Sequence, residues 1–167
     1  MKTKILLIIA VLYIFTSACS KEDATGTDKQ LYDMALVTNG FTWYKNSESY
    51  LPKSQGSGHN QAFLRTRYND LAATQLDSNG KVNPDAVFPN GSLIVKELYN
   101  SDKTLDQYAI LYKQSNHIDA DANGWVWGYV SASGKVAEPA EKKGQACTSC
   151  HLQTGHIDYL LMNKYFP

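Results

Sequence analysis

The pattern of apolar and polar residues along the chain predicts a β-rich body. Alternation with a period of two, interrupted by turn-forming residues, marks four strand-like segments. The turn sequence Phe88-Pro-Asn-Gly91 comes directly before three of these segments, which follow one another in quick succession. We therefore predict an antiparallel meander. The strand-like segments are residues 62–68, 92–99, 105–114 and 124–132.

The predicted sheet is apolar on both faces. In the last segment Trp125, Trp127 and Tyr129 point to one side, whereas Val126 and Val130 point to the other. A sheet of this kind has to be covered on both faces, and helices, a second subunit or a flat ligand can each do so. A homodimer is therefore one expected arrangement.

Short helices are predicted around the strands, so the expected fold class is α+β, an antiparallel β-sheet meander flanked by short helices. Thr27 or Asp28 can cap the first helix, and Asn39-Gly40 is a strong stop. The shared face of this helix holds Leu31, Met34, Ala35 and Thr38. The remaining predictions are a strand start at 41–45, a loop rich in Gly, Ser and Pro at 47–60, and helices at 69–76 and 158–162.

The N-terminal segment indicates export. Lys2 and Lys4 lead into an apolar run of 11 residues, Ile5 to Phe15, which is too short to span a bilayer and typical of a signal-peptide core. Ser17-Ala18-Cys19 resembles the lipobox of bacterial lipoproteins, although Thr16 stands where that pattern usually has Leu. We expect residues 1–18 to be a lipoprotein signal peptide and Cys19 to carry acyl chains that hold the protein at a membrane. The alternative is an ordinary secretory leader in which Cys19 is incidental.

Composition bounds the rest of the chain. Without the leader, the 167-residue sequence keeps 149 residues, with 14 Lys and Arg against 16 Asp and Glu. This acidic balance argues against a nucleic-acid partner. We expect residues 19–28 to be a polar tether and residues 29–167 to be one domain in the periplasm or cell envelope. In that oxidising compartment, a cysteine pair is either a disulfide or a derivatised site.

The most specific motif is Cys147-Thr-Ser-Cys150-His151, the C-x-x-C-H pattern of c-type haem attachment. The spacing lets two thiols reach the two vinyl groups of one porphyrin, and the adjacent His then lies below the iron as its proximal ligand. We therefore expect one haem c per chain, attached near the C-terminus. The alternatives are a thioredoxin-like pair, a zinc site that also uses His156, and a plain disulfide, and each lacks supporting sequence.

A sixth iron ligand is not evident from the sequence. Histidine in a loop or turn is usually solvated, and methionine in an apolar pattern usually packs in the core. We therefore expect an open, five-coordinate iron. The residues weighed as a sixth ligand are Met34, Met162, His59, His117 and His156.

Lys96 interrupts an apolar row. Along residues 92–99, Ile94, Lys96 and Leu98 share one face. A buried ammonium group loses its proton readily and becomes a nucleophile, whereas a lysine that reaches solvent or pairs with a carboxylate stays inert. Arg65 and Arg67 share a face of their own strand, and either one can meet a haem propionate or belong to an exposed polar face.

Together, the motif Cys147 to His151 and three internal segments resemble the cytochrome P-460 family, which includes the cytochromes c′-beta. The similarity covers nearly all of the chain from about Gly40 onward. It implies a β-sheet domain, often dimeric, with one haem c whose only axial protein ligand is His. It also implies that Lys96 is bonded to the porphyrin edge and that Arg65 is a pocket arginine. The three segments are Phe88-Pro-Asn-Gly-Ser-Leu-Ile-Val-Lys-Glu-Leu98, Leu64-Arg-Thr-Arg-Tyr-Asn-Asp70 and Asn123-Gly-Trp-Val-Trp127.

One departure from the family pattern leaves two function classes open. The acidic residue that serves proton transfer in hydroxylamine-oxidising members falls on Ala109, and oxidation of hydroxylamine needs a proton acceptor. The first class is an oxidoreductase that acts on hydroxylamine or nitric oxide, with an electron partner that the sequence does not identify. The second is a cytochrome that binds NO or CO, or carries electrons, without turnover. A structural lipoprotein without haem is a distant third.

Overall fold

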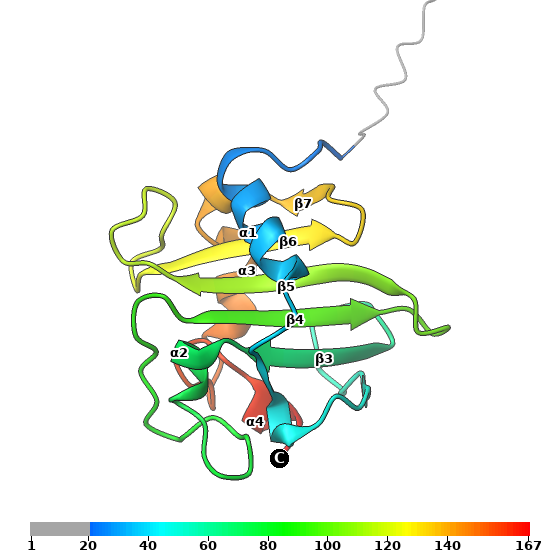
Figure 1. Cartoon of the computed structure of the whole chain (residues 1–167), viewed down its shortest axis with the longest axis vertical. Coiled ribbons are helices and arrows are strands. Elements are labelled where there is room, and N and C mark those ends of the chain that lie inside the picture. The colour runs from blue at the N-terminus through cyan, green and yellow to red at the C-terminus, as the bar shows by residue number, and fades with distance from the viewer. Residues whose placement is uncertain (1–20) are drawn as a thin grey trace, which may run out of the picture.

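A computed structural model describes residues 21–167, which form an antiparallel sheet with helices on both faces (Figure 1). The leader and Cys19 lie outside the described residues. Within residues 21–167, no helix has the length and apolar character needed to cross a bilayer. The elements are, in chain order, α1 (Gly26–Leu36), β1 (Thr42–Trp43), the 3-10 helix η1 (Tyr44–Asn46), β2 (Leu51–Pro52), β3 (Phe63–Tyr68), α2 (Asp70–Ala73), β4 (Leu93–Tyr99), β5 (Leu105–Lys113), β6 (Trp125–Ser131), β7 (Val136–Glu138), the 3-10 helix η2 (Ala140–Lys142), α3 (Gln145–His151) and α4 (Met162–Tyr165).

The seven strands form one sheet in the order β1-β3-β4-β5-β6-β7, with β2 paired to β3 as well. Strands β3 to β7 each pair antiparallel with the next, so the predicted meander and the α+β fold class are confirmed. The register sets one row of side chains across five strands on the same face. That row is Thr66, Lys96, Ala109, Tyr129 and Glu138.

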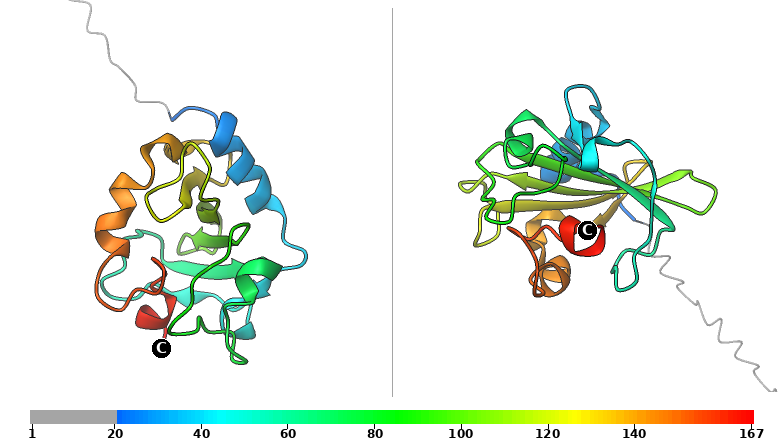
Figure 2. Two further views of the ribbon diagram at one scale, coloured as in Figure 1. Left: turned by 90° about the vertical axis from the view of Figure 1, so that its left-hand side faces the viewer. Right: turned by 90° about the horizontal axis from the view of Figure 1, so that it is seen from below.

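Helices and the C-terminal segment cover the two faces of the sheet, as its two-sided apolar pattern requires. Seen from below in Figure 2, α1 lies on one side of the sheet, and α3 and α4 lie on the other. Leu31 and Ala35 of α1 are buried against Val95, Ile110 and Val126 of the central strands. A helix that places its apolar stripe on the sheet in this way owes its stability to packing more than to its own propensity.

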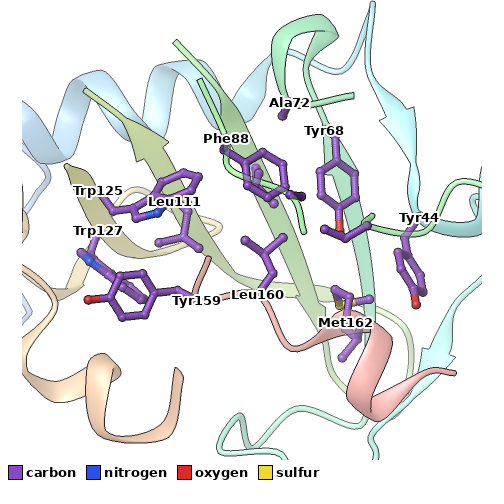
Figure 3. Close-up of a cluster of buried hydrophobic side chains, with 14 of the residues drawn as sticks. Tyr44, Tyr68, Ala72, Phe88, Leu111, Trp125, Trp127, Tyr159, Leu160 and Met162 are labelled. Carbon is purple, nitrogen blue, oxygen red and sulfur yellow. The ribbon is translucent and has the colours of Figure 1, made fainter. Parts of the chain in front are cut away.

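The opposite face carries the larger aromatic cluster. Tyr159, Leu160 and Met162 of the C-terminal segment belong to the same buried cluster as Leu111 and the two tryptophans of β6 (Figure 3). These C-terminal side chains are nearly inaccessible, at 3 to 5% exposed. The last residues of the chain therefore close the face on which the C-x-x-C-H motif lies.

Both ends of α1 differ from the prediction. The N-cap is Thr25, because the Thr27 hydroxyl donates instead to Asp119 at 2.6 Å, and the Asp28 carboxylate accepts from the backbone N–H of Ala140 at 2.9 Å. The helix ends at Leu36, before Asn39-Gly40. The Arg67 guanidinium donates to the carbonyl oxygens of Ala35 and Val37, and so satisfies the free carbonyls at the helix end from the neighbouring sheet.

Two further predictions are wrong in detail. Residues 22–24 of the expected tether bind the β6–β7 turn, with backbone bonds to Gly134 and Val136 and an ion pair of 2.7 Å from Lys135 to Asp23. The tail helix begins at Met162 instead of Asp158. Asp158 and Tyr159 both have positive φ, which excludes a helix, and the Asp158 carboxylate is held in its turn by Lys113 and Trp125.

Candidate cofactor pocket

A pocket of about 360 Å³ lies between the sheet and the C-terminal segment. Its sheet wall is mostly apolar and comes from β3 to β6, and its opposite wall comes from α3 and the residues that follow it. The pocket therefore brings the middle of the chain together with its last 22 residues. Its lining includes Leu64, Ile94, Lys96, Ala109, Leu111, Trp127, Tyr129, Cys147, Cys150, His151, Leu160 and Met162.

The helix α3 carries the whole motif, including Cys147, Cys150 and His151. It starts after Gly144, which has φ of +70° and lies so close to β6 that a Cβ there would be 2.6 Å from the Trp127 ring. Cys147 and Cys150, three residues apart, share a face of the helix and line the pocket together. Burial, with a smaller contribution from Glu138, raises the pKa of the Cys147 thiol to about 11.

The two thiols are free in the structure, and neither alternative site is formed. Cys147 and Cys150 are not joined in a disulfide. Among the described residues, no group of three His, Cys, Asp or Glu side chains is placed to hold a metal ion, so the ligands of the alternative zinc site do not come together.

His151 is oriented as a metal ligand would be. Its Nδ1 lies 2.7 Å from the carbonyl oxygen of Tyr159, and since a carbonyl only accepts, Nδ1 carries the proton and donates. This leaves Nε2 free, the arrangement usual for a ligating imidazole. The Trp127 ring packs edge-on against the His151 ring at 5.2 Å. Burial, and then the nearby Lys96 ammonium, lowers the pKa of His151 to about 4.

Lys96 lies on the pocket face, as the alternation along its strand predicts. It projects from β4 between Thr66 and Ala109 of the neighbouring strands. No carboxylate within residues 21–167 forms an ion pair with it, and burial lowers the pKa of Lys96 to about 8. About a tenth of this amine is therefore neutral at pH 7, far more than for an ordinary lysine, and the neutral form has a nucleophilic lone pair.

Arg65 does not reach the pocket, so its assignment as a pocket arginine is wrong. Arg65 pairs with Glu97 in the sheet register, and both point to the face opposite Lys96. Arg65 Nη2 donates to the Glu97 carboxylate at 2.6 Å, and its guanidinium lies over the Trp43 ring at 4.7 Å. Arg67 lies on that same face, fully buried, with its Nε 3.0 Å from Glu97. Neither arginine is placed to meet a propionate in this pocket.

His59 is brought into the pocket from the loop between β2 and β3, contrary to its interpretation as a solvated histidine. Its ring centroid lies 6.5 Å from that of His151 and 5.9 Å from that of Tyr129. Burial, followed by the charge of Lys96, lowers the pKa of His59 to about 2. The loop lies beside α3 at Gly58, where a Cβ would be in ordinary van der Waals contact with the Cys150 sulfur at 3.8 Å.

The other histidines and methionines weighed as iron ligands contact other groups of the protein. Met162 lines the pocket, but its sulfur accepts a hydrogen bond from Thr66 at 3.3 Å. Met34 packs on the α1 face of the sheet. The ring nitrogen of His117 caps the backbone of its own loop, and that of His156 accepts from the backbone of Tyr159.

Glu138 is a pocket carboxylate that the sequence did not reveal. It lines the pocket from β7 and stands in the same cross-strand row as Ala109, two strands away. Three strand spacings separate it from Lys96, roughly 14 Å. The strand β7 has only three residues, which is too short for a periodic signal.

The pocket fits a covalently attached haem. It offers two thiols on one helix face, an imidazole with a free Nε2 and apolar walls for a flat ring, and its one buried amine has no counter-ion among the described residues. A family model described as Cytochrome P460 matches residues 42–162, a span that includes the sheet, the motif and the first residue of α4. Neither the curated proteins nor the solved structures contain a match to the chain.

Proposed function

The chain belongs to the cytochrome P460 family, which implies a haem cofactor, and from this premise we propose that it is an exported c-type cytochrome, anchored to a membrane through Cys19, that acts in redox chemistry of hydroxylamine or nitric oxide. The observation that carries the proposal is the joint placement of Cys147, Cys150, His151 and Lys96 in one apolar pocket. Bound haem supplies one-electron chemistry and a coordination position for a small nitrogen oxide.

The two cysteines hold the haem in this proposal. Each Sγ–H adds across one vinyl group, so that a carbon–sulfur bond forms, the thiol hydrogen passes to the other vinyl carbon, and no net oxidation occurs. His151 then supplies the proximal nitrogen, and its hydrogen bond to Tyr159 fixes the ring orientation.

Haem attachment is tested by expression in a host with c-type maturation. Replacement of Cys147 or Cys150 by Ala should abolish or severely weaken covalent haem staining, because each removes one thioether. Ser149→Ala, in the same helix, is the matched control and should stain fully. Recovery of colourless, folded parent protein from such a host would contradict the proposal.

Lys96 is proposed to bond to the edge of the porphyrin. Formation of this nitrogen–carbon bond releases one N–H and one C–H hydrogen with two electrons, so it needs a two-electron oxidant such as a peroxide. The neutral amine that burial favours is the form that reacts. Mass spectrometry of digested protein should show the Lys96 peptide joined to that of Cys147 and Cys150. A reduced spectrum of ordinary c-type form, unchanged by Lys96→Ala, would contradict the cross-link.

The residues beside Lys96 in the sheet favour a second function. In this function the protein transfers electrons, or binds NO or CO, without turnover. Ala109 stands directly beside Lys96 and provides no proton acceptor, and the pocket carboxylate of Glu138 lies two strands further away. Steady-state assay of ferric protein with hydroxylamine and an electron acceptor separates the two functions. Sustained turnover supports the enzyme, whereas gas binding without turnover supports the second function.

A further inference from the structure

We propose that His59 is the sixth ligand of the haem iron, so that the resting protein holds the iron between two histidines. The inference rests on the proposed haem attachment and specifies the coordination of that same site. It replaces the expectation of an open, five-coordinate iron.

The spacing of the two rings supports this assignment. An imidazole nitrogen binds a transition metal at about 2.0–2.1 Å and lies about 1.1 Å from its ring centroid, so two imidazoles on opposite sides of one ion have centroids roughly 6.3 Å apart. The centroids of His59 and His151 are 6.5 Å apart, with ring planes at 75°. Axial imidazole planes can take any angle about a shared iron–nitrogen axis, so this angle is compatible with ligation.

The hydrogen bonding of His59 leaves it available. Within the described part of the chain, neither ring nitrogen of His59 has a hydrogen-bond partner, although both polar atoms sit in a mostly apolar pocket. Its backbone is held in place, because its N–H is bonded to the Ser57 hydroxyl, and the Tyr165 hydroxyl donates to the carbonyl of Gly56 at 3.1 Å. An iron ion between the rings would give the unpartnered nitrogen its missing contact.

The other candidates in the pocket are less well placed. The sulfur of Met162 is already bonded to Thr66, and His117 and His156 do not line the pocket. Lys96 is the remaining competitor, because its amine is buried beside both histidines and has no counter-ion within residues 21–167. The experiment therefore has to distinguish an imidazole from an amine.

The assignment changes what the site does. An iron held by two histidines transfers electrons without exchanging a ligand, whereas hydroxylamine, NO or CO must first displace His59. Ligand binding should then be limited by dissociation of His59, and its rate should level off at high ligand concentration. The structure thus favours a resting electron carrier in which small ligands enter by exchange.

The test is absorption and electron paramagnetic resonance spectroscopy of the haem-loaded protein. The ferric parent should be low-spin, His59→Ala should be high-spin, and added imidazole should restore the low-spin spectrum. His59→Ala should also bind CO at least tenfold faster in the ferrous state. His117→Ala, on a partly buried turn outside the pocket, is the matched control and should leave the spectrum unchanged. If His59→Ala folds poorly, His59→Met keeps a ligand and should raise the reduction potential.

The outcomes separate this inference from the proposed function. Haem-loaded parent protein that is high-spin, or a low-spin spectrum lost in Lys96→Ala and kept in His59→Ala, overturns the assignment of His59 alone. Folded protein without covalent haem overturns the proposed function and the ligand assignment together. Low-spin parent protein converted by His59→Ala and rescued by imidazole supports both.

Discussion

Replacement of Glu97 by Gln should destabilise the protein strongly without altering its haem spectrum. The Glu97 carboxylate is 3% exposed and accepts hydrogen bonds from Arg65, Arg67 and the Tyr99 hydroxyl on the face of the sheet opposite the pocket. Arg67 is 0% exposed, so the substitution leaves its guanidinium buried without a counter-ion. Breaking a buried ion pair by removing one partner costs about 3–5 kcal/mol.

Replacement of Arg65, the more exposed partner of Glu97, should cost much less stability than replacement of Glu97. The Arg65 side chain is 20% exposed, and its removal leaves Arg67 as the counter-ion of Glu97, so Arg65→Gln should cost only about 1 kcal/mol. For a chain of this length, about 1 kcal/mol shifts the melting temperature by about 2–4 °C, so Glu97→Gln should lower it by roughly 10 °C. Arg67 also binds the carbonyl groups at the end of α1, so the loss should include that helix.

The assay is denaturant unfolding of the haem-loaded proteins, followed by far-ultraviolet circular dichroism and by haem absorbance. Native spectra of Glu97→Gln and Arg65→Gln should match that of the parent, because both side chains lie behind the sheet. A loss below about 1 kcal/mol for Glu97→Gln would refute the reasoning about the buried charge. A changed spin state in Arg65→Gln would refute the placement of Arg65 outside the pocket.

Three further predictions concern the pocket face, α3 and the anchor. The first uses a haem-free variant in which both motif cysteines are replaced. In the folded protein the pKa of Lys96 is about 8, below its ordinary 10.5, so between pH 8 and 10.5 the unfolded chain binds more protons than the folded one. Stability should therefore rise by about 3 kcal/mol over that pH window in chemical denaturation, and a Lys96→Met variant should lack the rise. In the same measurement, Gly144→Ala should lower the free energy of unfolding by about 1–3 kcal/mol more than Gly26→Ala. A Cβ at Gly144 would lie 2.6 Å from the Trp127 ring, whereas a Cβ at Gly26 would meet nothing within 4 Å. Equal losses in the two variants would contradict that clash. Cys19→Ser should release the protein from the membrane fraction of the cell envelope in detergent-free fractionation, and unchanged retention would argue against a lipid anchor.

The main strands could be predicted because their signal is local. Alternation along β3 to β6 identified each of them to within one or two residues, and short connections indicated the meander. The strands β2 and β7 have two and three residues, too few for a period to register. The ends of α1 were missed because partners distant in sequence decide them. Arg67 satisfies carbonyl groups at one end, and Asp119 and Ala140 bind the hydroxyl and carboxylate expected to cap the other.

Of the pocket residues, those with a local sequence signal could be predicted, and those placed by distant segments could not. The motif from Cys147 to His151 is contiguous, and the position of Lys96 follows from alternation within one strand. The position of Arg65 relative to Lys96 depends on the register between β3 and β4, which no residue of either strand reveals alone. His59 and Glu138 come to the pocket from a glycine-containing loop and a three-residue edge strand, so only the folded arrangement identifies them.

Lys96 and Glu97 are neighbours in β4 that serve opposite faces, one the pocket and the other the buried ion cluster. Insertion or deletion of one residue in this strand would exchange the faces, and so place a carboxylate in the pocket and an uncompensated lysine among arginines. The length of β4 is therefore constrained more tightly than the identity of most of its residues. Over evolution, this domain should accept length changes in the turn at 100–104 and the loop at 114–124, and should change the chemistry of its pocket by substitution alone.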